Sequence, residues 1–542
     1  MEVPLTPLAL VARGLDLYRS RVAVRENGLT RTYAEFGERV MRLAGALKTM
    51  GIGEGDRVAL VAPNTAEALE AYTAVPLIGS VLVPINIRLS PGETAYILEH
   101  SRSRCLLIDA ECYDPLAPVL AERPDLRVVM HRPLGHSELR ERFEAWVQSG
   151  RVFDYEALLA MAEPVPLDPE RVDERAPITL NYTSGTTGRP KGVLLTHRGT
   201  CLNAVHMILA LGLEREDVHL HVAPMFHANG WGFVWAPFAV GATHVPLRKV
   251  EGRAILHATE ELGVTTFCAA STVLQGVLEA ARRFGSDFRS SHRVRVATAA
   301  GAPTPELLQQ VEGGLGWSVT HLYGMTETSA FVTVSEAPPK ALGTDPAVWA
   351  AYRARQGVPL LLAGRVRVVR PDGTDVRDDG AEMGEIVCRG NVIMQGYDQD
   401  PEGTRRALEG GWLHTGDLAV RHTDGSIEIC DRMKDIVKSG GEQVPSLEVE
   451  RILTQHPAVL EAAVVAKPDP YWGETPMAFL VLREGAVRPA DEDIREHCRE
   501  RLTHFKVPRA YAWLDALPRN GAGKVQKEVL RELARHGAKL SV

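Results

Sequence analysis

One short segment of this 542-residue chain limits its fold more than any other. The apolar residues 178–180 lead into a stretch rich in glycines, hydroxyl side chains and basic residues, 182–192 (YTSGTTGRPKG). A strand that opens into such a loop can point several backbone N–H groups at one anion. Hydroxyl donors and a lysine add to them, which favours a polyphosphate ligand. The loop is not a Walker A motif, because Pro190 stands where that motif needs glycine.

Strands and helices alternate through the first half of the chain. Residues 58–62 form an apolar run, Pro63, Asn64 and Thr65 predict a turn and a helix cap, 66–77 predict a helix, and 81–85 a second strand. This β-α-β order favours a mainly parallel sheet that is covered on both faces. Further strands are expected at 264–268 and 294–298. The predicted fold class is α/β.

The pattern of predicted elements changes in the second half of the chain. Asp-Gly pairs at 372–373 and 424–425 lie between β-rich runs and predict hairpins. We therefore predict an N-terminal domain over 1–433, with a β-rich subdomain at about 345–430, and a small mobile α+β domain over 434–542. Helices are expected at 448–453 and 491–502, and strands at 462–466 and 477–483.

Charge and cysteine content exclude several classes of protein. A net charge of −8 disfavours a dedicated nucleic-acid binder. Seven cysteines, with no C-x-x-C pair, fit reduced thiols and a cytoplasmic location better than disulfides or a zinc site. The N-terminus does not resemble a signal peptide, and the chain does not end in S-K-L. Residues 218–247 lack charged side chains, but their histidines, prolines and glycines predict a buried strand, loop and helix at a pocket, not a membrane span.

Three further motifs have residues suited to a nucleotide and an acyl group. The segment 224–231 (PMFHANGW) combines aromatic side chains with one imidazole, which suits the wall of an apolar pocket, although a lone histidine is more often a core residue. The small residues of 299–303 (AAGAP) leave room for a ring or a chain. In 323–328 (YGMTET), Tyr323 can stack on adenine, Thr326 can bind a phosphate or carboxylate, and Glu327 can ligate Mg²⁺. A helix start capped by Thr326 is an alternative.

Three motifs follow nearer the C-terminus. Asp417 in 411–417 can accept both ribose hydroxyls, or the segment can be a plain hairpin turn. The segment 431–442 (DRMKDIVKSGGE) lies at the expected domain boundary. Lys524 lies in a glycine-containing loop, 517–527, where a lysine is usually a solvated surface residue.

In this order, the motifs resemble those of the adenylate-forming superfamily, which includes acyl-CoA synthetases, luciferases and peptide-synthetase adenylation domains. The resemblance covers essentially the whole chain. It implies catalytic roles for Lys524, Glu327, Thr326 and His227, and a hinge at Lys434. It implies a loop for the second half-reaction at Ser439, Gly440, Gly441 and Glu442, and an acyl site at His227, Trp231, Ala300 and Gly301. The implied nucleotide-binding residues are Thr183, Ser184, Gly185, Thr186, Thr187, Gly188, Lys191, Gly301, Ala302, Pro303, Tyr323, Gly324, Asp417 and Arg432.

The resemblance also implies the reaction and its cofactors. A carboxylic acid attacks the α-phosphate of ATP, giving an acyl-adenylate and pyrophosphate, and coenzyme A then displaces AMP. Mg²⁺, at Thr187 and Glu327, and Lys524 would offset the crowded negative charge. Rotation of the C-terminal domain about Lys434 would separate the two half-reactions. A homodimer is left open.

The motifs look most like those of short- to medium-chain acyl-CoA synthetases. An acidic residue usually replaces His227 in amino-acid-activating domains, and the expected pocket strand, 267–274, has no Arg or Lys to hold a dicarboxylate. Ala300 stands where many relatives have glycine, and a single added methyl group changes discrimination by about 1–3 kcal/mol. The alternatives are a carrier-protein or amine acceptor, long-chain, aromatic or methylthio-substituted acids, and a non-catalytic nucleotide-binding regulator.

Overall fold

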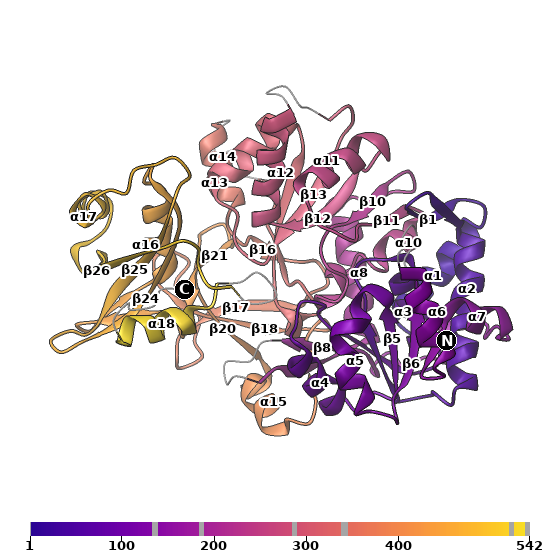
Figure 1. Cartoon of the computed structure of the whole chain (residues 1–542). Coiled ribbons are helices and arrows are strands. Elements are labelled where there is room, and N and C mark those ends of the chain that lie inside the picture. The colour runs from indigo at the N-terminus through magenta and orange to yellow at the C-terminus, as the bar shows by residue number, and fades with distance from the viewer. Residues whose placement is uncertain are drawn as a thin grey trace. The chain divides into compact units, whose positions relative to one another are not determined.

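A computed structural model describes residues 2–132, 139–183, 189–284, 290–337, 345–519 and 525–536 (Figure 1). The chain packs into two compact units. The first comprises Met1–Val366 with Cys388–Leu413, and the second comprises Arg367–Val387 with His414–Val542. The predicted β-rich subdomain is therefore divided: residues 367–387 and 414–430 group with the C-terminal residues, and the rest belongs to the first unit. The division into units does not test the rotation of the C-terminal domain about Lys434, so this hinge stays a prediction.

The first unit contains an eight-stranded sheet with the order β19-β9-β8-β4-β3-β5-β6-β7. The strands from β8 to β7 pair in parallel, whereas β9 is antiparallel to both β8 and β19. The strands are β3 (Arg57–Val61), β4 (Val81–Pro84), β5 (Cys105–Asp109), β6 (Arg127–His131), β7 (Val152–Asp154), β8 (Pro177–Thr183), β9 (Lys191–Thr196) and β19 (Gly396–Tyr397).

A nine-stranded sheet in the same unit has the order β16-β15-β14-β13-β12-β10-β11-β1-β2. It is parallel from β14 to β1 and antiparallel at both edges. The strands are β1 (Val22–Glu26), β2 (Leu29–Thr32), β10 (Val218–His221), β11 (Thr243–Pro246), β12 (Thr266–Ala270), β13 (Arg295–Ala299), β14 (Ser318–Tyr323), β15 (Thr333–Val334) and β16 (Val358–Pro359).

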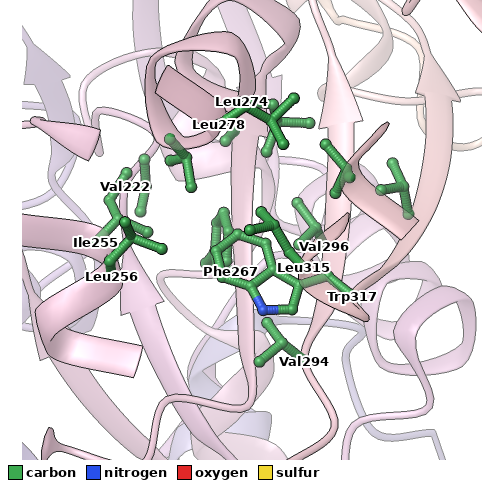
Figure 2. Close-up of a cluster of buried hydrophobic side chains, with 14 of the residues drawn as sticks. Val222, Ile255, Leu256, Phe267, Leu274, Leu278, Val294, Val296, Leu315 and Trp317 are labelled. Carbon is green, nitrogen blue, oxygen red and sulfur yellow. The ribbon is translucent and has the colours of Figure 1, made fainter. Parts of the chain in front are cut away.

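Helices flank these sheets (Figure 1). They are α1 (Pro7–Leu17), α2 (Tyr33–Thr49), α3 (Ala66–Leu77), α4 (Pro91–His100), α5 (Tyr113–Ala121), α6 (Arg140–Gln148), α7 (Tyr155–Met161), α8 (His197–Leu211), α9 (Ala228–Trp231), α10 (Ala236–Val240), α11 (Gly252–Glu261), α12 (Ser271–Phe284), α13 (Pro305–Gln310), α14 (Pro346–Arg353) and α15 (Pro401–Ala407). Figure 2 shows the apolar core between the helices and the nine-stranded sheet, where the rings of Phe267 and Trp317 meet edge to face with centroids 5.4 Å apart.

The second unit contains most of a four-stranded sheet and all of a five-stranded sheet. The first is formed by β17 (Arg365–Val369), β18 (Gly384–Arg389), β20 (Leu413–Arg421) and β21 (Ile427–Arg432). The second is formed by β22 (Val437–Ser439), β23 (Glu442–Val444), β24 (Val459–Asp469), β25 (Gly473–Leu482) and β26 (Ala510–Leu514). Its helices are α16 (Ser446–Thr454), α17 (Asp491–Arg499) and α18 (Lys527–His536).

The structure confirms the α/β fold class and the first β-α-β unit. Helix α3 has the predicted bounds, and the hydroxyl of Thr65 accepts a hydrogen bond from the N–H of Ala68, 3.1 Å away, as a helix cap does. Residues 218–247 contain β10, α9, α10 and β11, and most of them are buried. Within the described parts of the chain, none of the helices combines the length and hydrophobicity that crossing a bilayer requires.

Three histidines are buried side by side in the nine-stranded sheet. His221 and His244 share a 2.9 Å hydrogen bond, and His219 lies 3.1 Å from the hydroxyl of Thr266 and stacks on Phe233. Burial lowers the pKa of all three rings, that of His221 to about 3. They are therefore neutral in the folded protein at pH values where unfolded histidine, with its ordinary pKa of about 6.5, takes up a proton.

We predict that the free energy of unfolding falls as the pH drops below about 6.5, because only the unfolded chain protonates these rings. Each ring contributes up to about 1.4 kcal/mol per pH unit. Urea unfolding over a pH series measures the slope, which should be shallower in His221→Gln and unchanged in His257→Gln, since His257 is exposed. Equal slopes in wild type and His221→Gln would contradict the assignment.

Candidate active site

The predicted phosphate loop connects the antiparallel strands β8 and β9. Thr183 and Lys191 are directly opposite each other in this pairing, so the two ends of the loop are held together. Ser184, Gly185, Thr186, Thr187 and Gly188 lie outside the described residues. Their roles in binding phosphate stay predictions, but the strands that would present them are in place.

Lys191 lies beside two residues of a distant segment of the chain. Its ammonium is 4.8 Å from the centroid of the Tyr397 ring and 3.8 Å from a carboxylate oxygen of Asp400. Strand β19 brings both residues there, because Tyr397 pairs with Val193 of β9. The side chain of Lys191 is partly exposed, so it can reach a phosphate from this position.

Tyr397 also binds the predicted metal ligand. Its hydroxyl donates a hydrogen bond to Oε1 of Glu327, 2.9 Å away, and the N–H of Met394 donates to the backbone oxygen of Glu327 at 2.8 Å. Burial and the negative charge of Glu327 raise the pKa of Tyr397, so the hydroxyl stays protonated and continues to donate. No sequence motif indicates Tyr397, because a two-residue strand places it here.

Glu327 is the predicted Mg²⁺ ligand. It is a buried carboxylate that accepts a hydrogen bond from Tyr397. Mg²⁺ suits such a place, because it is usually bound through one or two carboxylates, substrate phosphates and water.

The segment around Tyr323 is a tight turn. Tyr323 ends β14, and the short 3₁₀ helix η5 (Thr326–Thr328) follows. The helix cap considered at Thr326 is wrong, because η5 already begins at Thr326 and its cap residue is Met325. At Gly324 a Cβ atom would lie 2.1 Å from the backbone oxygen of Ala330, which no side chain can tolerate. Stacking of Tyr323 on adenine stays a prediction.

The turn after β13 contains the small residues predicted to face the acyl group. Ala300 is exposed and has φ +72°, a left-handed conformation that favours glycine. Gly301 and Ala302 are exposed too, and Pro303 is buried. The expected pocket strand 267–274 is wrong in its second half: β12 ends at Ala270, α12 begins at Ser271, and Leu274 belongs to the apolar core of Figure 2.

A left-handed turn carries the predicted gate residue. Residues 228–232 all have positive φ, and Trp231, at φ +57°, is buried with its ring edge-on to Phe331. Asn229 is buried in the same turn and donates a 2.9 Å hydrogen bond to the hydroxyl of Thr179 in β8. Such a turn persists only where its surroundings hold it.

Two further side chains fix the approach to His227. The amide of Asn64 accepts from the N–H of Met225 at 2.8 Å and donates to the backbone oxygen of His221 at 2.7 Å. The hydroxyl of Tyr72 donates to the backbone oxygen of Met225 at 2.5 Å. The sequence indicates only a turn at Asn64, no role for Asn229 within the motif 224–231 and nothing at Tyr72, since these contacts join segments far apart in the chain.

In the second unit, Asp417 and Arg432 face each other. They are paired residues of β20 and β21, and the guanidinium of Arg432 is 3.1 Å from a carboxylate oxygen of Asp417. Asp417 is buried and Arg432 is half exposed. A carboxylate oriented by an arginine suits a ribose diol, the role predicted for Asp417.

The predicted loop of the second half-reaction is the tip of a hairpin. Ser439 pairs with Glu442, and Gly440 and Gly441 between them have φ +60° and +88°. A Cβ atom on Gly440 would also lie 2.5 Å from the Trp472 ring. Lys434 precedes this hairpin, with its ammonium 3.6 Å from Glu528. Lys524 lies outside the described residues.

We predict that Tyr397→Phe weakens the use of MgATP, because Glu327 loses its phenol partner while a ring remains beside Lys191. Removing a hydrogen bond to a charged group costs about 1.5–3 kcal/mol, which is about a ten- to hundredfold loss in kcat/KM for MgATP. Tyr155→Phe is the matched control, since Tyr155 donates to Glu70 at 2.6 Å. This control should lower stability alone; unchanged MgATP kinetics in Tyr397→Phe would refute the assignment.

Comparisons with known proteins agree on the family. Residues 12–398 match the model of the AMP-binding enzyme family, and residues 448–524 match that of the AMP-binding enzyme C-terminal domain. The chain is 38% identical over 536 residues to 2-methylpropanoate–CoA ligase CCL4 of Humulus lupulus, covering 98% of this chain and 95% of that protein. It is also 38% identical to acetate/butyrate–CoA ligase AAE7, peroxisomal, of Arabidopsis thaliana, with 98% and 95% covered.

Solved structures give the same result. The anthranilate CoA ligase AuaEII, in complex with anthranoyl-AMP, superposes with a TM-score of 0.84 at 25% identity, covering 100% of this chain and 99% of that one. The first family model alone matches well over half of the sequence. This chain therefore belongs to the AMP-binding enzyme family.

Proposed function

We propose that this AMP-forming acyl-CoA synthetase activates a short- to medium-chain carboxylic acid. The turn at residues 228–232 is the observation that carries the proposal. Its strained backbone places Trp231 against Phe331, and Trp231 is only 5% exposed, which suits a wall that closes an acyl site after a few carbons. The relatives named for 2-methylpropanoate and for acetate and butyrate support the same size class.

The described residues suit the first half-reaction. The acid attacks the α-phosphate of ATP, and pyrophosphate leaves. Lys191 would meet the departing phosphates, and Asp417 with Arg432 would hold the ribose. Mg²⁺, when bound with ATP near Glu327, would offset phosphate charge. In the second half-reaction the coenzyme A thiolate attacks the acyl carbonyl and AMP leaves.

We also propose that the enzyme works in a reducing compartment, the cytoplasm. All seven cysteines are free thiols, and five of them are buried. Burial raises the pKa of Cys105 and of Cys268 to about 12, so these thiols stay protonated and unreactive. Because some relatives are named as peroxisomal, imaging of the tagged protein is the test. Peroxisomal signal would refute the cytoplasmic location.

A panel of acids in a pyrophosphate-release assay tests the activity and the size class together. Acetate, butyrate, 2-methylpropanoate and hexanoate should give higher kcat/KM than palmitate or benzoate, and coenzyme A should be the acceptor, detected as acyl-CoA. Lys524→Ala should abolish pyrophosphate release but spare thioester formation from supplied acyl-adenylate. A preference for palmitate would refute the size class, and equal loss of both half-reactions would refute the role of Lys524.

A second prediction concerns Ala300. Ala300→Gly should shift the preference towards longer or aromatic acids, because one methyl group in an apolar site changes discrimination by about 1–3 kcal/mol. Stability should change by less than about 1 kcal/mol, because relief of left-handed strain is offset by the backbone entropy of glycine. Arg102→Gly, at an exposed residue with φ +53°, is the control and should leave the preference unchanged. An unchanged acid series in Ala300→Gly would contradict the assignment.

A further inference from the structure

The loop that contains Lys524 is closed at its base. Arg519 and Val525 form an isolated antiparallel bridge, and the N–H of Gln526 donates to the backbone oxygen of Pro518 at 2.8 Å. Residues 520–524, between the two sides of the bridge, lie outside the described part of the chain. The contacts that hold the two sides of this base therefore determine where the loop begins and where it ends.

A mostly buried ion pair holds the C-terminal end. Lys527 is the first residue of α18, and its ammonium lies 2.7 Å from Oε1 of Glu450 and 2.5 Å from the hydroxyl of Ser446. The side chains of Lys527 and Glu450 are only 14% and 15% exposed. Glu450 also accepts from the N–H of Val464 in β24, at 2.7 Å. Lys527 is therefore tied through α16 to the central sheet of the domain.

The N-terminal end is held less firmly. Arg519 pairs with Glu461 at 2.9 Å, but the two side chains are 34% and 37% exposed, and ion pairs with that exposure contribute little. Of the two ion pairs at the loop base, the pair of Lys527 is therefore the more buried.

Stability alone does not account for this pair. Helix α18 already packs through Leu530 and Ala534, which are buried in an apolar cluster with Phe479. Replacing a buried ion pair by neutral groups is often close to neutral for stability, because removing two charges from water costs several kcal/mol. What the pair adds is a fixed position, three residues after Lys524, for the end of the loop.

We propose that Lys527 is a positioning residue for adenylation: its pair with Glu450 and Ser446 fixes the end of the loop that presents Lys524. The inference rests on the proposed role of Lys524. It assigns to Lys527 no contact with substrate. The backbone N–H of Ser446 donates to Asp431, next to the predicted hinge, and changes in the side chains at 527 and 450 leave this bond in place.

The test is the double variant Lys527→Met/Glu450→Gln, which removes both charges of the pair, while the buried Asp431 keeps the hydrogen bonds from the N–H groups of Ser446 and Arg432. Its unfolding midpoint should stay near that of wild type. Its kcat for pyrophosphate release should fall about 100-fold, the effect of a displacement of about 1 Å in a reacting group. Thioester formation from supplied acyl-adenylate should stay near wild type, and Lys527→Arg should retain adenylation.

A second lysine–glutamate pair on α16 provides a matched control. Glu448, like Glu450, belongs to α16, and its carboxylate is 2.7 Å from the ammonium of Lys506. Lys506 lies in the 3₁₀ helix η8 (His504–Lys506), which is not part of the loop base. Lys506→Met/Glu448→Gln should leave both half-reactions at wild-type rates. If Lys527→Met alone fails to fold, the double variant still gives the answer.

Two outcomes would overturn the inference: a double variant with wild-type adenylation, or one in which both half-reactions fall together with the unfolding midpoint. Wild-type protein and Lys524→Ala distinguish a failure of the inference about Lys527 from a failure of the proposed function. If wild type releases pyrophosphate, Lys524→Ala does not, and the double variant does, only the inference about Lys527 fails. If wild type releases no pyrophosphate with any acid of the panel, the proposed function fails and the inference fails with it.

Discussion

The pairing of β9 with two partners is the interaction on which the candidate site depends. On one side β9 pairs with β8, so that Thr183 and Lys191 hold the ends of the predicted phosphate loop together. On the other side it pairs with β19, which brings Tyr397 beside Lys191 and onto Glu327. A cation predicted to meet phosphate and a carboxylate predicted to ligate Mg²⁺ are thereby held near one phenol, and the three side chains come from separate parts of the chain.

The wall of the predicted acyl site is formed by a strained backbone turn and not by paired strands. Five consecutive residues at 228–232 adopt positive φ, and such conformations cost of order 1–3 kcal/mol each for residues other than glycine. The hydrogen bonds of Asn229, Asn64 and Tyr72 hold the turn and the segment leading to it. A wall whose backbone is held by these bonds suits discrimination between acids that differ by a few methylene groups.

Local signals predicted much of the fold. Helix α3 was predicted with its bounds because its cap, Thr65, and its length are encoded within a dozen residues. The strand predicted at 267–274 was too long, because the change to helix at Ser271 has no glycine or proline to mark it. Tyr397 could not be predicted, since its role arises from a two-residue strand that pairs across the chain. For the same reason the motif residues predicted a site, but not the side chains that support it.

The central claim is that the acid is activated by bonding to the α-phosphate of ATP. Butyrate with both carboxylate oxygens labelled with ¹⁸O tests it directly, because the attacking oxygen stays on phosphorus when coenzyme A displaces the nucleotide. Mass spectrometry of the products should find one ¹⁸O atom in AMP and none in pyrophosphate. Label in inorganic phosphate, with ADP as the nucleotide product, would show an acyl-phosphate route and would contradict the account.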